Sequence, residues 1–375
     1  MKRMKFPWTI IVVVLLFATL TNGYTNPLSE APAATITSFK RLSDEVVTAR
    51  IARINLPFAA RSSSQVKAMI RRYTVEGYRD SEDILGRSAM YFPIFEHYLR
   101  LYNLPEALKY LPIVESSLLP DAESPLGAAG LWQFIPSTAR MYGLKVNGQV
   151  DERRDPHKAT EAAVRMLASL YEQFGDWSLV LAAYNCGPGR VRKAIRAANS
   201  TKFQVLKAFL PMESQHYVPR FVAAAYLMNY YSAHGLTPDY PSQELLDTRT
   251  FRLGKSLHLG TAARQLGVSY RTMCRLNPSF LQGMIPASEK GQYVTVPTAA
   301  ATAFASLYLP ALGNTSRNGR QLSSYLTVPG DDLETLAALF ACKPAEIMEW
   351  NGLTSPRLTI NQSLMIWLPR QVVRP

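Results

Sequence analysis

The chain has 375 residues, of which 47% are hydrophobic, and this excludes a protein too short or too polar to bury a core. We expect two or three domains. The formal net charge of +13 favours an anionic polymer or surface as partner, and both nucleic acid and the anionic cell wall fit. The sequence has no dense Lys/Arg run and no nucleic-acid-binding motif, so charge alone does not choose between them.

The N-terminus has the pattern of an export signal, which we predict for residues 1–23. Lys2, Arg3 and Lys5 precede an apolar stretch from Trp8 to Leu20 that is too short for an ordinary membrane span. Small and polar residues at 21–23 suit a cleavage site, and the alternative is an uncleaved N-terminal anchor. No Cys comes directly after this stretch, so nothing here indicates a lipid anchor. In either case we expect the protein to work in the periplasm or cell envelope.

The cysteines give no sign of a metal site. Cys186, Cys274 and Cys342 fall in three different predicted domains, and an odd number leaves at least one thiol free. We interpret them as small buried apolar residues. The three Cys and five His show no metal-ligand spacing, so we predict no metal and no cofactor.

Residues 24 to about 60 are rich in small and polar residues and are expected to be a loosely packed lead-in with a weak helix near 42–54. They belong to a partly helical N-terminal extension that we predict for residues 24–84. From about residue 65 to 235 apolar residues recur at helical spacing. One helix should begin at Asp155-Pro156, with Asp as N-cap and Pro in the first turn, and should end at Gly175. Residues 85–240 are therefore predicted to form a mostly α-helical domain.

The pattern changes after residue 241, where two segments share the plan of a short strand, two short helices and a second short strand. They cover residues 250–298 and 323–370, and Ala/Ser-rich residues 299–322 between them are expected to be partly linker. A repeat at this spacing indicates a duplicated small module. The predicted fold class is thus multi-domain: a mostly α domain followed by two small α+β modules of βααβ type.

Glu115 is the strongest catalytic candidate. It lies in the segment Tyr110–Leu119, where most neighbours in sequence are apolar. Loss of hydration favours the neutral carboxyl, and a neutral carboxyl is the form that a general acid needs near neutral pH. A single Glu is more often a helix cap or the partner of an Arg, so this interpretation needs support from other segments.

Two further segments provide that support. Gly127-Ala-Ala-Gly-Leu-Trp-Gln-Phe-Ile-Pro136 combines small residues, which allow close approach of a backbone, with Gln133, which can donate to and accept from a sugar. In Ala183-Tyr-Asn-Cys-Gly-Pro-Gly189 a helix face ends at a sharp break, where Tyr184 can face a cleft. The structural alternatives are a tight helix contact for the first segment and a buried Tyr for the second.

A glycosidase ordinarily uses a second carboxylate. Asp121, Glu123, Asp151 and Glu213 are candidates, and none lies in a segment that indicates a nucleophile. Glu213 opens the last helix of the domain, where an acid also suits the helix dipole. Spacing alone therefore leaves open whether the enzyme hydrolyses the bond or uses one acid/base for an internal transfer.

Five ordered motifs together resemble the Slt-type lytic transglycosylases, whose catalytic domain is lysozyme-like. They are Glu115-Ser116, Gly127–Pro136, Asp151–Pro156, Ala183–Gly189 and Glu213-x-x-x-Tyr-Val-Pro219. The two C-terminal modules resemble LysM domains, and the whole resemblance covers roughly residues 65–369.

The resemblance implies cleavage of the β-1,4 bond between N-acetylmuramic acid and N-acetylglucosamine in peptidoglycan, with 1,6-anhydro ends. By this similarity Glu115 is the acid/base. The implied substrate-binding residues are Ser116, Ser124, Gln133, Tyr184, Asn185, Glu213 and Tyr217. The family usually has Glu-Thr-Arg where this chain has Glu213-Ser214-Gln215, which puts one charge contact in doubt.

LysM domains bind N-acetylglucosamine-containing chains in a shallow groove. By resemblance the groove of the second module would involve Gly330, Asp331, Asp332, Asn351, Gly352 and Leu353, although these residues also suit turns and caps. The first module lacks the Gly-Asp turn of the second at Gly330-Asp331 and is interpreted as a degenerate module.

The sequence therefore predicts an exported lytic transglycosylase whose partner is the glycan strand of peptidoglycan, with peripheral or N-terminal membrane association as an option. A muramidase that admits water and a non-catalytic wall-binding protein are the alternatives. A nucleic-acid binder is supported by charge alone.

Overall fold

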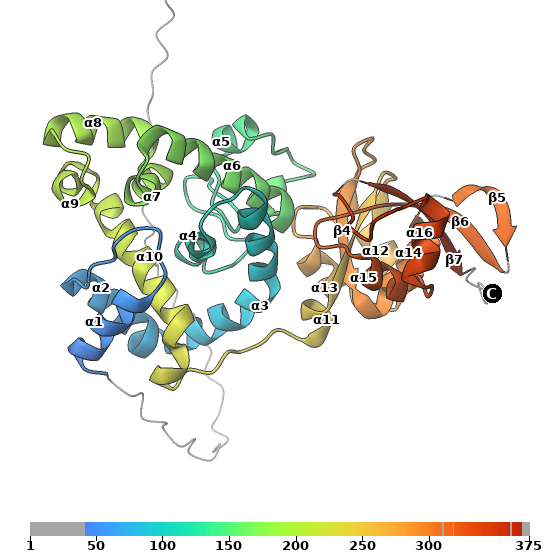
Figure 1. Ribbon diagram of the computed structural model, residues 1–375, viewed down its shortest axis with the longest axis horizontal. Coiled ribbons are helices and arrows are strands. Elements are labelled where there is room, and N and C mark those ends of the chain that lie inside the picture. The colour runs from blue at the N-terminus through green and yellow to red at the C-terminus, as the bar shows by residue number, and fades with distance from the viewer. Residues whose placement is uncertain (1–41, 310, 318, 361, 370–375) are drawn as a thin grey trace, which may run out of the picture. The chain divides into compact units, whose positions relative to one another are not determined.

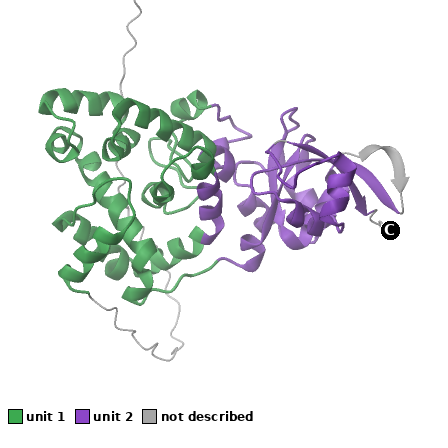
Figure 2. Cartoon of the chain, viewed as in Figure 1, with its two compact units in different colours: residues 1–88, 98–142, 160–240 green, residues 89–97, 143–159, 241–375 purple. Residues whose placement is uncertain are grey.

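A computed structural model describes residues 42–309, 311–317, 319–360 and 362–369 (Figure 1). These residues form two compact units (Figure 2). The first contains residues 42–88, 98–142 and 160–240, and the second contains residues 89–97, 143–159 and 241–369. The predicted signal, residues 1–23, lies outside the described residues, as do residues 24–41 of the predicted extension.

The first unit is built from helices. Its α-helices, two of which also contribute residues to the second unit, are α1 (Asp44–Arg53), α2 (Ser64–Arg71), α3 (Tyr78–Leu101), α4 (Leu111–Ser116), α5 (Pro136–Met141), α6 (Pro156–Phe174), α7 (Trp177–Cys186), α8 (Pro188–Ala198), α9 (Phe203–Leu206) and α10 (Met212–Tyr230). A π-helical turn covers Arg72–Glu76, and 3-10 turns cover Glu106–Tyr110, Lys207–Phe209 and Tyr231–His234.

Side-chain caps determine where several of these helices begin. Asp155 accepts hydrogen bonds from the backbone N–H groups of His157 and Lys158, both at 2.9 Å, immediately before α6. Gly175 follows the last residue of α6 with a φ of +63°, a conformation that glycine adopts without a Cβ clash. The helix expected from Asp155-Pro156 to Gly175 is therefore confirmed at both ends.

Helix α10 is the central helix of the first unit and contacts α1, α2, α4 and α7. The N-terminal extension packs against it: the aliphatic side chains of α1 and α2 (Val47, Ile51, Val66 and Ile70) form a buried cluster with Val222, Ala223 and Tyr226 of α10. Each such aliphatic side chain contributes roughly 1.5–3 kcal/mol when fully buried. The helix predicted near residues 42–54 is present as α1, but the expectation of loose packing is wrong for this helix, since Val47 and Ile51 are buried in the cluster.

The second unit contains the two small modules. Its elements after residue 240 are α11 (Gln243–Leu246), β1 (Thr248–Leu253), β2 (Leu257–His258), α12 (Leu259–Leu266), α13 (Tyr270–Leu276), β3 (Met284–Ile285), β4 (Gln292–Pro297), α14 (Thr298–Tyr308), β5 (Ala311–Arg317), β6 (Arg320–Leu326), α15 (Leu333–Leu339), α16 (Pro344–Asn351) and β7 (Ser363–Pro369). A 3-10 turn at Glu152–Arg154 also belongs to this unit.

Each module closes by pairing its first and last strands. Strands β1 and β4 are antiparallel with Phe251 opposite Val294, and β6 and β7 are antiparallel with Ser323 opposite Ile366. Two short helices connect the strands of each pair, so the predicted βααβ plan is present in both modules. Strand β5 adds to the edge of the second sheet beside β6.

One asparagine in each module has the same hydrogen bonds, which supports a duplication. The amide of Asn277 donates to the carbonyls of Met273 and Thr295 and accepts from the Thr295 N–H. In the second module Asn351 donates to Ile347 and Met365 and accepts from the Met365 N–H. Both side chains fasten the end of the second helix to the last strand.

The segment that we expected to be partly linker contains helix α14 instead. Ala301, Phe304 and Ala305 of α14 are buried in a core that both modules share. The Phe304 ring lies 4.9 Å from that of Phe251 in β1, and Phe251 in turn lies 6.2 Å from Tyr325 in β6. The small Ala side chains that suggested a linker are strong helix formers, and here they allow close packing. The two modules are therefore joined by a common core.

Candidate functional site

Helix α4 positions Glu115 next to a buried core. The helix is short, has Pro112 in its first turn, and buries Leu111 and Ile113. It ends abruptly because Ser117 and Leu118 have left-handed φ angles of +52° and +61°, which are uncommon for residues with a Cβ. Glu115 thus lies in the last turn of a helix whose other side chains are fixed by packing.

The carboxyl of Glu115 is partly accessible to solvent, but protein surrounds it closely. Burial, and to a smaller extent the nearby negative charge of Glu213, raise the pKa of Glu115. A hydrogen bond that the Tyr217 hydroxyl donates to Oε1 and the positive charge of Arg220 oppose this rise. Since desolvation outweighs both, the net pKa of Glu115 is about 7, well above the ordinary value of 4.5.

Ser116 ties α4 to the following loop. Its hydroxyl is buried and lies 2.9 Å from the carbonyl of Leu131 and 3.1 Å from that of Pro112, to which it can donate. The donor capacity of Ser116 is therefore used inside the protein. The structure gives this residue a structural role, and the substrate contact that the resemblance implies stays a prediction.

The loop before α5 is held by its own hydrogen bonds. Ser124 and Ala128 bond reciprocally: the Ser124 N–H donates to the Ala128 carbonyl at 2.8 Å, and the Ala128 N–H donates to Ser124 Oγ at 3.0 Å. Gly127 and Gly130 have φ angles of +74° and +84°, which explains the glycines of the motif. Ser124 is buried, so its main role in this structure is to shape the loop.

Gln133 is held in an unusual backbone conformation, with a φ of +48°. Its side-chain nitrogen donates to the carbonyls of Ala122 and Gly130, at 3.2 and 3.0 Å. Its carbonyl oxygen has no hydrogen bond among the described residues, so this oxygen remains able to accept one from a ligand. A strained residue fixed by its neighbours is a frequent property of functional sites.

Helix α7 contributes Tyr184 and Asn185. The Tyr184 hydroxyl donates to the carbonyl of Trp132 at 2.8 Å, which joins α7 to the loop that carries Gln133. Asn185 accepts a hydrogen bond from Ser214 Oγ at 2.6 Å, and it also bonds to Glu213. The helix ends at Gly187, whose φ is +87°, and Pro188 begins α8, so the break expected from the sequence is present.

The first turns of α10 face the same site. Glu213, Tyr217 and Arg220 are spaced by four and three residues, which puts them on one face of the helix. Tyr217 is 2% exposed, and burial raises the pKa of its hydroxyl well above the ordinary value. Burial also raises the pKa of Glu213, against the positive charge of Arg220 and the hydrogen bond from Asn185.

Arg220 was not identified from the sequence, although it acts on both carboxyl groups. At the position of the family's usual Arg, Gln215 donates a hydrogen bond to the carbonyl of Leu210. Arg220 instead provides the positive charge that lowers the pKa of Glu115 and of Glu213. The sequence feature that could have identified Arg220 is its spacing of seven residues from Glu213, which is two helical turns along the same face.

Among the candidates for a second carboxylate, only Glu213 interacts with Glu115. Asp151 belongs to the second unit, where it forms a buried ion pair with Arg153 at 2.7 Å. Asp121 and Glu123 are exposed. The structure therefore brings together Glu115, Tyr217 and Glu213 and gives Asp151 a structural role.

The described part of the chain offers no cluster of three or more His, Cys, Asp or Glu side chains that could hold a metal ion. All three cysteines are free, and burial raises the pKa of the Cys186 thiol. In the same part of the chain, no helix is long and apolar enough to cross a membrane.

Family models match three segments of the chain. Residues 92–207 match the transglycosylase SLT domain, residues 247–311 match the LysM-like domain of lytic transglycosylase MltD, and residues 325–367 match the LysM domain. The chain carries an SLT domain followed by LysM-type domains. The predicted fold class, a mostly α lysozyme-like domain followed by two small α+β modules, is therefore confirmed.

Among curated proteins, the chain is 33% identical over 299 residues to membrane-bound lytic murein transglycosylase D of Escherichia coli K12. This match covers 76% of the chain and 65% of that protein, so the chain spans slightly less than two thirds of this relative. It is 32% identical over 108 residues to the soluble lytic murein transglycosylase of the same strain, which covers 27% of the chain and 17% of that protein.

A solved structure, the soluble lytic transglycosylase SLT70 of Escherichia coli, is 23% identical and covers 46% of this chain and 31% of that one, with a TM-score of 0.34. In the present chain the SLT match contains Glu115, Gln133 and Tyr184, whereas Glu213 and Tyr217 lie beyond its end. The network around Glu115 thus combines the SLT segment with the first turns of α10.

The residues expected in the LysM groove make turns and caps in the structure. Asp331 accepts hydrogen bonds from the Tyr325 hydroxyl at 2.8 Å and from the Val328 N–H at 2.7 Å, and burial raises its pKa to about 6. Asp332 caps α15 by accepting from the Thr335 N–H. Gly330 and Gly352 adopt left-handed φ angles of +92° and +60°. In the first module His258 caps α12 in place of an Asp, by accepting from the Gly260 N–H.

Proposed function

We propose that the protein is a lytic transglycosylase that cleaves the β-1,4 bond between N-acetylmuramic acid and N-acetylglucosamine in peptidoglycan. The observation that carries this proposal is the Glu115 carboxyl, which has a pKa of about 7 and accepts a hydrogen bond from Tyr217 inside a site with the SLT match. The curated relatives are named as lytic murein transglycosylases, and this supports the proposal for this chain.

The reaction begins with the protonated carboxyl of Glu115. It donates its proton to the glycosidic oxygen, the bond from that oxygen to C1 of the muramoyl residue breaks, and positive charge develops on the sugar. Because the Tyr217 hydroxyl donates to Oε1, Oε2 is the oxygen left to carry the proton. The same hydrogen bond stabilises the carboxylate that remains after proton transfer.

The second half of the reaction uses the same carboxyl as a base. The Glu115 carboxylate takes the proton from the C6 hydroxyl of the muramoyl residue, and the C6 oxygen forms a bond to C1. This step closes the 1,6-anhydro ring, restores the neutral acid and consumes no water. A single carboxyl with a pKa near 7 suits both halves, since it is neither a strong acid nor a strong base at neutral pH.

Other residues orient the sugar. The free carbonyl oxygen of Gln133 can accept from a sugar hydroxyl or an N-acetyl N–H, and Asn185 and Glu213 offer further polar groups beside α10. The hydrogen bond from the Tyr184 hydroxyl to the Trp132 carbonyl joins helix α7 to the loop that carries Gln133. Arg220 limits the accumulation of negative charge when Glu115 and Glu213 are both ionised.

Product analysis tests this function. The purified protein should release muropeptides with 1,6-anhydro ends, which mass spectrometry separates from reducing ends by the mass of one water. Glu115→Gln should abolish release, and Glu172→Gln on the exposed surface of α6 is the matched control. Reducing ends would establish a muramidase, and unchanged release by Glu115→Gln would leave a wall-binding protein without catalysis at this site.

We also propose that the LysM-type modules hold the enzyme on glycan. Their shared core makes them one body, so two weak sites would act together by avidity. Gly330, Asp331, Asp332, Asn351, Gly352 and Leu353 border the proposed groove, whose backbone is shaped by the turns described above. The N-terminal pattern of residues 1–23 supports export to the periplasm or cell envelope, with peripheral or N-terminal membrane association.

A further inference from the structure

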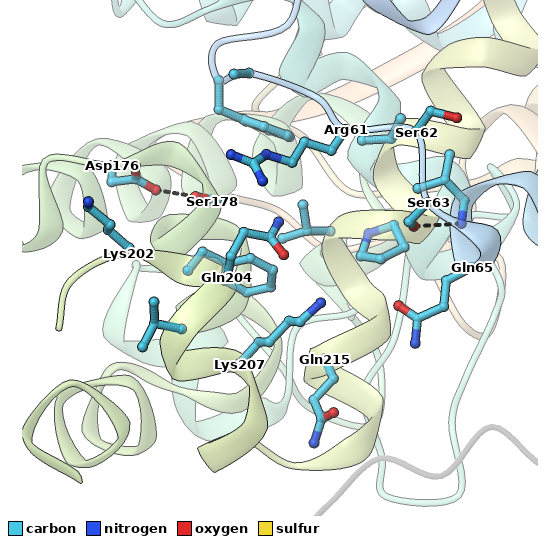
Figure 3. Close-up of a pocket in the computed structure, with 18 residues that line it drawn as sticks. Arg61, Ser62, Ser63, Gln65, Asp176, Ser178, Lys202, Gln204, Lys207 and Gln215 are labelled. Carbon is cyan, nitrogen blue, oxygen red and sulfur yellow. Dashed lines mark hydrogen bonds between the residues drawn. The ribbon is translucent and has the colours of Figure 1, made fainter. Parts of the chain in front are cut away.

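The first unit has a pocket whose lining does not include Glu115. It has a volume of about 710 Å³ and lies between the segment that leads into α2, the residues of α9 with the turn after it, and one face of α10 (Figure 3). We refer to it as the α9–α10 pocket. Its α10 residues Val218, Pro219 and Val222 lie roughly 100–200° around the helix from Tyr217, since successive residues are ~100° apart. The pocket is therefore separate from the site around Glu115.

The charged groups of this pocket are mainly positive. Arg61 belongs to the wall before α2, and Lys202 and Lys207 belong to the wall formed by α9 and its flanking residues (Figure 3). None of the three has an ion-pair partner within the described ranges. The carboxylate that lines the pocket, Asp176, already caps α7 by accepting from the Leu179 N–H at 3.0 Å. Uncompensated positive charge in a concave surface attracts anions.

The remaining lining combines side-chain amides with apolar surface. Gln65 and Gln204 present amides from opposite walls, and Phe58, Val66 and Val222 provide apolar contact. An amide both donates and accepts, which matches the alternating N–H and C=O groups of a peptide backbone. Cations pair with carboxylates, and apolar walls accept small side chains such as alanine methyls. A bare phosphate would leave the amide carbonyls and the apolar walls unused.

We propose that the α9–α10 pocket binds a short peptide rich in carboxylates, the chemistry of the stem peptide carried by peptidoglycan. This inference rests on the proposed function for the identity of the peptide. The pocket is within the usual size range of small-ligand sites, roughly 300–1,000 Å³. Because it lies on another face of α10 from Tyr217, it would recognise a stem peptide without occupying the position of the scissile bond.

Calorimetric titration of the full chain with an N-acetylated stem tetrapeptide tests the proposal. Lys202→Glu with Lys207→Glu should weaken binding roughly tenfold or more, because two charge-assisted contacts become repulsive. Lys193→Glu with Arg196→Glu on α8 makes the same change in net charge away from the pocket and should leave binding unchanged. Wild-type binding should also weaken as salt concentration rises.

The proposal would be overturned by absence of binding at millimolar peptide, or by equal binding to both double variants. Peptide binding that inorganic phosphate at similar concentration displaces completely would also overturn it, since the site would then be one for simple anions. A cleavage assay on glycan strands without stem peptides distinguishes a failure of this proposal from a failure of the proposed function. Both double variants should cleave this glycan at the wild-type rate. If the wild-type protein itself failed to cleave it, the proposed enzymatic function would be refuted, independently of the result of the peptide titration.

Discussion

Glu115→Gln should stabilise the protein, and the gain should grow as the pH rises. The Glu115 pKa is about 7 in the folded protein and near its ordinary value of 4.5 in the unfolded chain. At pH values between these two pKa values, Glu115 is ionised in the unfolded chain but still protonated in the folded protein. Folding stability therefore falls as pH increases through this window and is then constant above about pH 7. A neutral Gln does not titrate, so the variant avoids this loss.

The magnitude follows from the two pKa values. At about 1.36 kcal/mol per pKa unit, a folded value near 7 against 4.5 corresponds to roughly 3 kcal/mol at pH 8. At pH 5 only the first part of the window has been crossed, and the penalty is roughly 1 kcal/mol. For a unit of this size, 1 kcal/mol corresponds to about 2–4 °C in Tm. Glu115→Gln should raise Tm by roughly 6–12 °C at pH 8 and by about 2–4 °C at pH 5.

Thermal unfolding followed by circular dichroism at the two pH values measures this difference directly. Glu172→Gln removes a carboxyl from the exposed surface of α6 and should change Tm little at either pH. An equal gain at pH 5 and pH 8 would mean that the effect of Glu115→Gln is one of packing. A loss of stability at pH 8 would refute the assignment of a costly buried charge.

Three further variants test other parts of the account. Tyr217→Phe removes a hydrogen bond that lowers the Glu115 pKa, so the alkaline limb of the kcat/KM–pH profile should move to higher pH while the rate falls roughly tenfold to a hundredfold. Ser116→Ala leaves the Leu131 carbonyl without its buried donor and should cost about 1–3 kcal/mol in urea unfolding, without moving that pH profile. Phe304→Ala should destabilise the second unit by about 3–5 kcal/mol, measured by its thermal transition, and no change would restore the linker interpretation.

The site could be predicted from sequence wherever local chemistry determines the residue. Glu115 was identified because its neighbours in sequence are apolar, and the same desolvation dominates its pKa in the structure. The break after α7 could be predicted because Gly187-Pro188 cannot continue a helix. The βααβ modules were found from their repeated pattern, and both family models cover them.

Other features depend on contacts that are distant in sequence. The role of Ser116 depends on the Leu131 carbonyl, and that of Arg220 depends on which face of α10 meets α4. A run of Ala, Ser and Gly suits a linker and a closely packed helix equally well, so only the Phe251 and Tyr325 rings distinguish α14 from a linker. The α9–α10 pocket likewise joins residues 58–66 with residues about 140 positions later.

The most direct test of the central claim is infrared titration of the Glu115 carboxyl, taken as the difference between wild type and Glu115→Gln. We expect the protonated C=O band of this one group to disappear with a midpoint near pH 7, and Tyr217→Phe should move the midpoint upward. A midpoint near 4.5, the value of a solvated carboxyl, would contradict the account, because no neutral acid would then be available to protonate the glycosidic oxygen.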